Sequence, residues 1–334
     1  ADWHGKPLKK GEETQKAIDE LTKQLSPNGA AVQIHTPSAP SAAPVTIGTI
    51  PPPPYKIGDA VATREAFGAA LEALGSVNPL VVALDADVKN STYTDKFGKK
   101  FPNRFFENFI AEQNMVGAAA GLAACGKIPF AATFACFFSR AYDFIRMAAI
   151  SGSNIKLVGT HVGVSIGEDG PSQMGLEDIA MMAVQPNVTV LYPSDGNSTY
   201  RLLEAAAQHK GMVYVRAGRP KTPVIYGQDE QFHIGGSKII RESTSDILTI
   251  VAAGVTLFEA LKAHDQLKAA GIAVRVIDLY SIAPIDRTTL VESGRATQRR
   301  ILTVEDHYAH GGLGDAVLSA VSTEGIAVHK LAVR

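Results

Sequence analysis

Short apolar segments alternate with segments of helical pattern along most of the chain, and this alternation constrains the fold more than any other feature. Strands are expected at 80–84, 105–111, 128–134, 155–164, 188–191 and 212–216. Helices are expected at 59–74, 113–125, 140–150, 176–183 and 196–209. Apolar strands separated by helices form a parallel sheet that is covered on both faces. The pattern therefore predicts an α/β fold.

A second unit of the same kind follows a loop at 218–231. Strands at 247–251 and 274–279 flank a helix that ends at Gly271, and Thr256 and Glu259 have the spacing of a capping box at its start. A strand, a helix and a second strand in this order predict parallel pairing of the two strands. Segments 300–305, 314–321 and 326–333 continue the pattern. We therefore expect an α/β protein with two parallel-sheet domains.

The first 54 residues differ from the rest in composition. Residues 9–25 are polar and helix-permissive, whereas 35–54 are rich in Pro, Ala, Ser and Thr and end in four consecutive prolines. Proline lacks the N–H that helices and strand ladders need, so this stretch is expected to be a semi-rigid linker. The predicted divisions are 1–54 as tail and linker, 55–230 as the first sheet domain and 231–334 as the second.

Composition and charge exclude several classes of protein. The 334 residues carry 32 Lys+Arg and 33 Asp+Glu, a net charge of −1, so a basic nucleic-acid arm or a membrane-surface polycation is not expected. Only two cysteines are present, without metal-site spacing, which favours a reducing compartment. No apolar run reaches the roughly 18 residues of a membrane span. We expect a cytoplasmic protein that binds small molecules, with no nucleic acid, no membrane and no metal held by these residues.

Polar residues follow the predicted strands, where ligands of open α/β sheets bind. They are Asp85, Asp87, Glu112, Thr133, His161, Glu168, Asp169, Asp195, Arg216 and Arg219. Carboxylates in such positions also cap helices, and capping is the favoured reading for Asp195. The residues Arg64, His161 and Arg219 could converge on a phosphate or carboxylate, although each could instead be a surface or ion-pair residue.

Glu112 and a group of phenylalanines are the least ordinary residues near the ends of the predicted strands. Glu112 follows an aromatic, apolar strand, where desolvation would raise the pKa of its carboxyl unless a ligand bonds it; the alternative is an N-cap of the next helix. Phe134, Phe137 and Phe138 lie at a strand-to-helix junction, either as core aromatics or as a clamp for a planar heterocycle. The loop at 165–173 contains two glycines and a proline, but no Walker, zinc or nucleophile-elbow motif occurs in the chain.

Five strings together resemble the transketolase family, in its mammalian-type branch. They are FIAEQNM at 109–115, SIGEDGPSQM at 165–174, ILTVEDH at 301–307, DVKNST at 87–92 and WHGKPL at 3–8. The resemblance covers essentially the whole chain. It implies a pyrimidine-binding domain followed by a C-terminal domain that stops short of the family's usual end.

The resemblance also implies thiamine diphosphate as cofactor, with Mg²⁺ (or Ca²⁺) held by an N-terminal domain. That domain's Gly-Asp-Gly…Asn pattern does not occur in these residues, and the sequence starts without Met. We therefore expect a piece of a longer enzyme, in preference to one subunit of a split enzyme. The isolated chain is expected to be inactive without the diphosphate-binding domain.

Site residues are carried over from the family by motif. Glu112 matches the carboxyl that bonds the pyrimidine ring nitrogen and promotes the tautomer that deprotonates the cofactor's reactive carbon. Phe134 and Phe137 match the wall on which the pyrimidine stacks, and Asp87 matches an acid near the cofactor across the dimer interface. His4 matches a histidine beside the reacting carbon, a second candidate catalytic residue.

The remaining positions match the residues that bind substrate. Asp169 matches the residue that reads a sugar hydroxyl, and Gln173 stands where other branches carry a histidine. The group that grips the sugar phosphate is matched by Arg64, Ser91, His161 and Arg219, with Lys6 as a further phosphate-side candidate.

The implied function is transfer of a two-carbon ketol unit from a ketose phosphate of the xylulose 5-phosphate type to an aldose phosphate, ribose 5-phosphate or erythrose 4-phosphate, in the pentose phosphate pathway. The implied assembly is a homodimer of the full-length enzyme or a heteromer with a diphosphate-binding subunit. Alternatives are deoxyxylulose-phosphate synthase, dihydroxyacetone synthase, the β subunit of a 2-oxo acid dehydrogenase, or a non-catalytic transketolase-like subunit. The trio Ser91, His161 and Arg219 favours a sugar-phosphate substrate over a 2-oxo acid.

Overall fold

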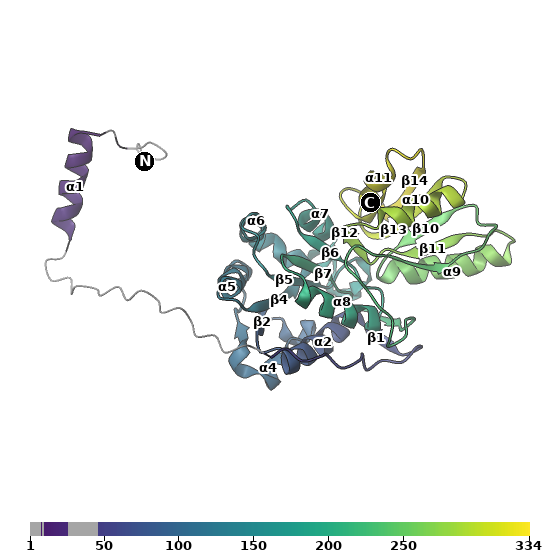
Figure 1. The fold of residues 1–334 in the computed structure, drawn as a ribbon, viewed down its shortest axis with the longest axis horizontal. Coiled ribbons are helices and arrows are strands. Elements are labelled where there is room, and N and C mark those ends of the chain that lie inside the picture. The colour runs from purple at the N-terminus through teal and green to yellow at the C-terminus, as the bar shows by residue number, and fades with distance from the viewer. Residues whose placement is uncertain (1–7, 9, 26–45) are drawn as a thin grey trace. The chain divides into compact units, whose positions relative to one another are not determined.

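The computed structural model describes residues 8, 10–25 and 46–334, which belong to two units. The first unit, Ala1–Pro44, contains helix α1 (Glu12–Gln24), none of whose residues is buried. The second unit, Val45–Arg334, contains all the other elements, arranged around two sheets (Figure 1). Within the described ranges, no helix is both long enough and apolar enough to cross a membrane.

The first sheet has seven strands and is parallel except at one edge. Its order is β12 (Ser281–Ala283), β6 (Thr189–Leu191), β7 (Val213–Arg216), β5 (Lys156–Thr160), β4 (Ile128–Phe134), β2 (Val81–Asp85) and β3 (Phe105–Glu107). Strand β12 alone is antiparallel, and it comes from beyond the predicted boundary at residue 230. The predicted parallel α/β architecture is confirmed. The sheet is completed, however, by a strand that the alternation pattern did not indicate.

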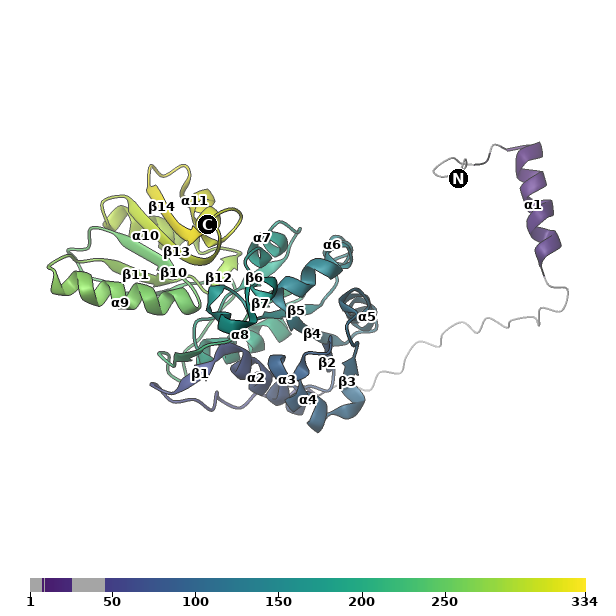
Figure 2. The ribbon, with the colours of Figure 1, turned by 180° about the vertical axis from the view of Figure 1, so that it is seen from behind.

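Helices cover both faces of this sheet, as Figures 1 and 2 show. One buried cluster joins the sheet to α5 (Glu112–Ala124), α6 (Tyr142–Ile150) and α7 (Asp178–Ala183). The cluster on the other face contains residues of α2 (Thr63–Val77), α4 (Asp95–Lys100) and α8 (Gly196–Gln208). Short helical turns lie between them at α3 (Lys89–Thr92), η1 (Pro102–Arg104), η2 (Ala135–Ala141), η3 (Val164–Asp169) and η4 (Pro171–Gln173). Burial on both faces explains why the central strands are apolar over most of their length.

The second sheet has five strands. Its order is β14 (Ala327–Val333), β13 (Arg300–Tyr308), β10 (Thr249–Ala252), β11 (Arg275–Asp278) and β9 (Lys238–Arg241), of which only β9 is antiparallel. Helices α9 (Val255–Ala269), α10 (Arg287–Ala296) and α11 (Leu313–Val321) pack against it, and β1 (Ala60–Ala62) pairs with β8 (Lys221–Pro223) in a separate ribbon. The predicted parallel pairing of β10 with β11 is confirmed.

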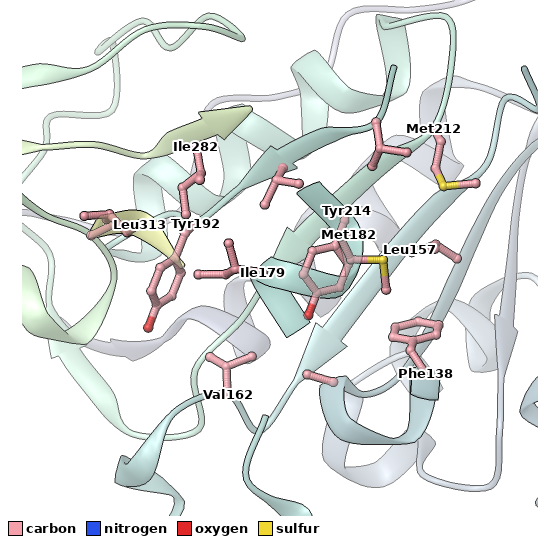
Figure 3. Close-up of a cluster of buried hydrophobic side chains, with 14 of the residues drawn as sticks. Phe138, Leu157, Val162, Ile179, Met182, Tyr192, Met212, Tyr214, Ile282 and Leu313 are labelled. Carbon is pink, nitrogen blue, oxygen red and sulfur yellow. The ribbon is translucent and has the colours of Figure 1, made fainter. Parts of the chain in front are cut away.

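One hydrophobic cluster spans both sheets. Figure 3 shows Tyr192 and Ile282 beside Leu313, and all three belong to the cluster that also contains Phe138 and Tyr214. Two large surfaces buried against each other through one core behave as a single compact unit. The position of one sheet therefore constrains the other.

Three local predictions are corrected by the structure. The strand expected at 105–111 ends at Glu107, because Phe109 has a left-handed φ of 53° that an extended strand cannot accommodate. The capping box at Thr256 is wrong, since the N-cap of α9 is Gly254 and the Thr256 hydroxyl donates to the carbonyls of Ala253 and Val304. Helix α2 begins at Thr63, four residues after the expected start at Asp59.

Candidate active site

The carboxyl ends of β2, β4, β5 and β7 lie along the same side of the seven-stranded sheet, because these neighbouring strands are parallel. We call this side, where the strands end, the carboxyl edge. The segments that leave this edge carry most of the expected site residues: Asp87 and Ser91 after β2, Phe134 and Phe137 at the end of β4, His161, Asp169 and Gln173 after β5, and Arg219 after β7. Arg64 joins them from the first turn of α2, and Glu112 from the first turn of α5. His4 and Lys6 lie outside the described residues.

A basic cluster, defined as Arg64, His161 and Arg219, forms at this edge. Arg64 Nη1 donates to the carbonyl of Ser91 at 2.9 Å and lies 3.4 Å from Nε2 of His161. Arg219 Nη1 lies 3.0 Å from Oδ2 of Asp169, the same oxygen that is 3.9 Å from Nε2 of His161. The structure thus brings together five of the expected substrate residues.

Arg219 is held by the loop that follows β5. It ion-pairs with Glu168 at 2.9 Å as well as with Asp169, and Nη1 donates to the carbonyl of Ile166. Glu168 is exposed and both Arg219 and Asp169 are half-buried. Exposed ion pairs of this kind contribute little to stability and exchange partners readily. The ion-pair alternative considered for Arg219 is therefore observed, in a form that leaves the guanidinium accessible.

His161 is buried, and its surroundings keep it neutral. Burial, followed by the charges of Arg64 and Arg219, lowers the pKa of His161 to about 3. Since Arg64 donates toward Nε2, the proton is assigned to Nδ1, which lies 3.0 Å from the Thr160 hydroxyl; Thr160 in turn donates to the carbonyl of Thr133 at 3.4 Å. Thr160 was not expected as a site residue, and it fixes the orientation of the imidazole.

Phe134 and Phe137 form a stacked pair beside the basic cluster. Their ring centroids are 5.2 Å apart at an interplanar angle of 12°, and the imidazole of His161 stacks on Phe134 with centroids 3.7 Å apart. Phe134 is buried between these neighbours, whereas Phe137 is half-buried. Phe138 packs in the core instead, as the alternative reading of these aromatics predicted.

Glu112 is buried but does not cap a helix. It is 4% exposed, and α5 begins after Ala111 without a side-chain cap bond, so the N-cap alternative is wrong. Arg140, from η2, donates to Glu112 Oε2 at 3.0 Å and to the carbonyl of Ile110 at 2.7 Å. Phe109 and Ile110, which were expected to desolvate this carboxyl, are instead exposed. Glu112 and Arg140 are 28 positions apart in the chain, so no local pattern indicates this pair.

Two further expected residues lie at the edge without joining the basic cluster. Asp87 is exposed, has a left-handed φ of 62°, and donates its backbone N–H to Glu107. Gln173 ends η4, and its backbone N–H donates to the carbonyl of Gly170. Among the described residues, no hydrogen bond joins either side chain to Arg64, His161 or Arg219. Asp195 caps α8 through Ser198, which confirms its capping alternative.

A cavity of about 530 Å³ lies at the opposite end of the sheet. It is lined by residues that precede or begin the strands, among them Leu80, Ile128 and Asn154. Nearby, Lys156 is buried and donates to Asn154 and to two carbonyls, and burial lowers the pKa of its amine to about 7. The amine of Lys156 is already bonded to three protein acceptors, so the candidate site is placed at the carboxyl edge.

Two family models match this chain, one over the residues of most of the first sheet and one over those of the second. Residues 59–224 match the family "Transketolase, pyrimidine binding domain", and residues 235–334 match "Transketolase, C-terminal domain". The chain is 50% identical over 336 residues to a transketolase of Mus musculus and 49% identical to transketolase-like protein 1 of Bos taurus. Each alignment covers 99% of this chain but only 54% and 56% of the relative, so the chain spans about half the length of these relatives.

A solved structure described as a split gene transketolase, inactive beta4 tetramer, is 45% identical, with a TM-score of 0.76. The match covers 83% of this chain and 90% of that one. A transketolase of Pichia stipitis in complex with sedoheptulose 7-phosphate is 24% identical with a TM-score of 0.66, which shows a shared fold. On these matches, which include more than half of the chain in two domains of one family, the chain belongs to the transketolase family.

Proposed function

We propose that the chain provides the pyrimidine-binding and C-terminal parts of an enzyme that transfers a two-carbon ketol unit from a ketose phosphate to an aldose phosphate. The family depends on thiamine diphosphate. The observation that carries the proposal is the basic cluster beside the stacked phenylalanines, joined through His161. An anion-binding group next to an aromatic face suits a phosphorylated substrate that reacts beside a planar ring.

The phosphate is proposed to bind between Arg64 and Arg219. Two guanidiniums match a phosphate dianion in both charge and donor geometry. Arg64 Nε is buried without a partner among the described residues, and an unsatisfied buried donor of this kind is costly unless a ligand bonds it. Ser91 and neutral His161 would position Arg64. Once the phosphate has replaced Asp169 as a partner of Arg219, the Asp169 carboxylate would accept a hydrogen bond from a sugar hydroxyl.

The pyrimidine of the cofactor is proposed to lie against Phe137, the more exposed ring of the pair, with Phe134 behind it. Arg140 bonds only one of the two oxygens of Glu112, so the second oxygen remains for the ring nitrogen. The residues present therefore fit the group. When bound, thiamine diphosphate supplies the electron sink that holds the two-carbon unit between donor and acceptor. Glu112 would hold the proton shared with the pyrimidine.

Other parts of the proposal depend on residues that the structure does not describe, on described residues outside the basic cluster, or on residues outside this chain. His4 is proposed beside the reacting carbon, Lys6 near the phosphate, Asp87 near the cofactor and Gln173 near the substrate. Mg²⁺ or Ca²⁺ and the diphosphate are assigned to a diphosphate-binding portion, on the same polypeptide or on a partner subunit, in a homodimer or a heteromer. The existence of a split-gene transketolase that resembles this chain supports a diphosphate-binding portion on a partner subunit. We place the reaction in the cytoplasmic pentose phosphate pathway.

The direct test uses this chain together with its diphosphate-binding portion. Incubation with xylulose 5-phosphate and ribose 5-phosphate is expected to yield sedoheptulose 7-phosphate. Glu112→Gln is expected to lower kcat by about 100-fold or more, the contribution of a positioned proton-transfer group. The matched control is Glu305→Gln, a similarly buried carboxyl near the start of α11, which should retain near wild-type turnover. Absence of sedoheptulose 7-phosphate, or an active Glu112→Gln enzyme, would contradict the proposal.

A further inference from the structure

The string at 301–307 belongs to strand β13, in the second sheet, and contributes no residue to the candidate site. Its last residues instead contact the first sheet. Asp306 Oδ1 accepts from Arg216 Nη1 at 2.6 Å and from the Tyr192 hydroxyl at 3.0 Å. Two backbone links flank this contact: Ala180 N–H donates to His307 Nε2 at 3.3 Å, and Tyr308 N–H donates to the carbonyl of Leu176 at 2.9 Å.

Arg216 connects Asp306 with the loop that carries His161 and Asp169. Its Nη2 donates to the carbonyl of Gly175 at 2.9 Å and to the carbonyl of Asp306 at 3.0 Å. The Gly175 N–H donates to the carbonyl of His161 at 3.1 Å, and the Gly163 N–H donates back to the carbonyl of Gly175 at 2.8 Å. The base of the loop at 161–175 is therefore closed on itself and anchored by one guanidinium.

Gly163 shows how closely the loop rests on Asp306. Its φ is 73°, and a Cβ placed there would lie 1.8 Å from Asp306 Oδ2. A backbone conformation that favours glycine thus coincides with a close approach that only glycine allows. The carboxylate of the second sheet therefore contacts the backbone two residues after His161.

The groups in this connection are buried and paired. Arg216 and Asp178 are fully buried and Asp306 is 3% exposed, and Arg216 Nε donates to Asp178 Oδ2 at 2.9 Å. We call Arg216, Asp178 and Asp306 the inter-sheet ion cluster. Buried charges that are fully hydrogen-bonded hold one arrangement, because any other leaves a charge unpaired away from water. Tyr192, whose hydroxyl donates to Asp306, lies beside Ile282 and Leu313 in the apolar core (Figure 3).

We propose that Asp306 and Arg216 are positioning residues for the candidate site. Through Gly175 and Gly163 they fix the loop at 161–175, and so set where His161 and Asp169 meet the substrate. This assignment gives the C-terminal sheet a part in substrate binding, although none of its residues belongs to the basic cluster. It rests on the proposed function, because it takes His161 and Asp169 to be substrate-binding residues.

A purely structural role would be to join the two sheets, and the chain provides a matched control for that role. Asp278, on β11 of the same sheet, is fully buried and accepts from the hydroxyls of Ser194 at 2.8 Å and Tyr226 at 2.6 Å. It links the second sheet to the segments that follow β6 and β8, and among the described residues it forms no hydrogen bond with the loop at 161–175. Asp278→Asn and Asp306→Asn therefore make the same chemical change at two inter-sheet carboxylates.

The first measurement is hydrogen–deuterium exchange of peptides that cover 161–175, in the absence of substrate. Asp306→Asn is expected to speed exchange of the Gly163 and Gly175 amides by about tenfold or more, whereas Asp278→Asn leaves them within about twofold of wild type. Urea unfolding of both variants shows how much global stability each has lost. Unchanged exchange in Asp306→Asn, or the same acceleration in both variants, would overturn the proposal whatever the enzyme's activity.

The second measurement is kinetic and uses the complete enzyme. Asp306→Asn is expected to raise KM for xylulose 5-phosphate about tenfold while kcat changes less than about threefold; Asp278→Asn should keep KM within about twofold. A loosened loop with an unchanged KM would refute the positioning role. If the wild-type enzyme makes no sedoheptulose 7-phosphate, the proposed function fails instead, and the role assigned to Asp306 in substrate binding fails with it.

Discussion

Two arginines three residues apart, at the end of strand β7, have opposite surroundings. Arg216 is fully buried and donates to two carboxylates and two carbonyls. Arg219 is half-buried, and its partners include Glu168, which is exposed. Burial alone would lower the pKa of Arg216, but Asp178 and Asp306 hold it well above its usual range.

The difference separates a structural charge from one available to a ligand. Each of the three guanidinium nitrogens of Arg216 already donates to a protein acceptor, so a ligand would have to replace a buried carboxylate. Around Arg219 a phosphate has to displace only a partly solvated carboxylate, which costs little free energy. Two arginines that are close in sequence can therefore have different roles. The extent to which protein groups already bond each guanidinium distinguishes these roles better than sequence position does.

The largest effect is expected from Arg216→Met. Removing one partner of a buried ion pair leaves Asp178 and Asp306 without their counter-charge, and about 3–5 kcal/mol of the free energy of unfolding should be lost. Urea unfolding, followed by circular dichroism, measures this loss. Arg219→Met is the matched control and should change the same quantity by less than about 1 kcal/mol. Equal losses in the two variants would remove the distinction between the arginines.

Substrate binding, in contrast to stability, is expected to depend more on Arg219 than on Arg216. Arg219→Met should raise KM for xylulose 5-phosphate in the complete enzyme by about 10- to 100-fold, since a charge-assisted hydrogen bond is worth roughly 1.5–3 kcal/mol. Arg201, which pairs with Glu204 on helix α8, provides the control Arg201→Met, with KM expected near wild type. An Arg219→Met enzyme with normal KM would show that this guanidinium does not bind the phosphate.

A smaller effect concerns the pH dependence of stability. The pKa of His161 is lowered to about 3 in the folded chain from 6.5, so between these values the unfolded state binds more protons. Stability should therefore rise with pH across this window and be lost as pH falls through it. At pH 5 the wild-type chain should have lost about 2 kcal/mol relative to pH 8 through this residue.

The variant His161→Asn isolates that contribution. It keeps a side-chain donor for Thr160 but has no titrating group, so its unfolding free energy should decrease less between pH 8 and pH 5. The difference between the two curves is the measurement, because other titrating groups are common to both. Parallel curves would mean that burial and the charges of Arg64 and Arg219 do not hold His161 neutral.

Much of the first sheet and of its candidate site could be predicted from the sequence. Strand β4 was predicted with its bounds, and the polar residues after the strands do lie along one edge. Local pattern sufficed there, because a strand buried on both faces is apolar over most of its length. Strand β12 has only three residues and was missed, because it forms by pairing with β6, a segment 90 residues earlier.

Pairings between distant residues escaped the sequence for the same reason. Nothing local relates Arg140 to Glu112, or Asp306 to Arg216, which are 28 and 90 residues apart. Arg216 appeared in the sequence only as one more polar residue after a strand. Its role became visible when the second sheet placed a carboxylate against it.

Periodicity and contiguous strings, which are local properties of the chain, were enough to predict the α/β class, the alternation of parallel strands with helices, and the family. Which charged side chains are fully paired with protein groups, and which remain open to a ligand, depends on the tertiary structure. Pairing depends on what another segment brings within about 3 Å, and a buried charge is stable only when that partner is present.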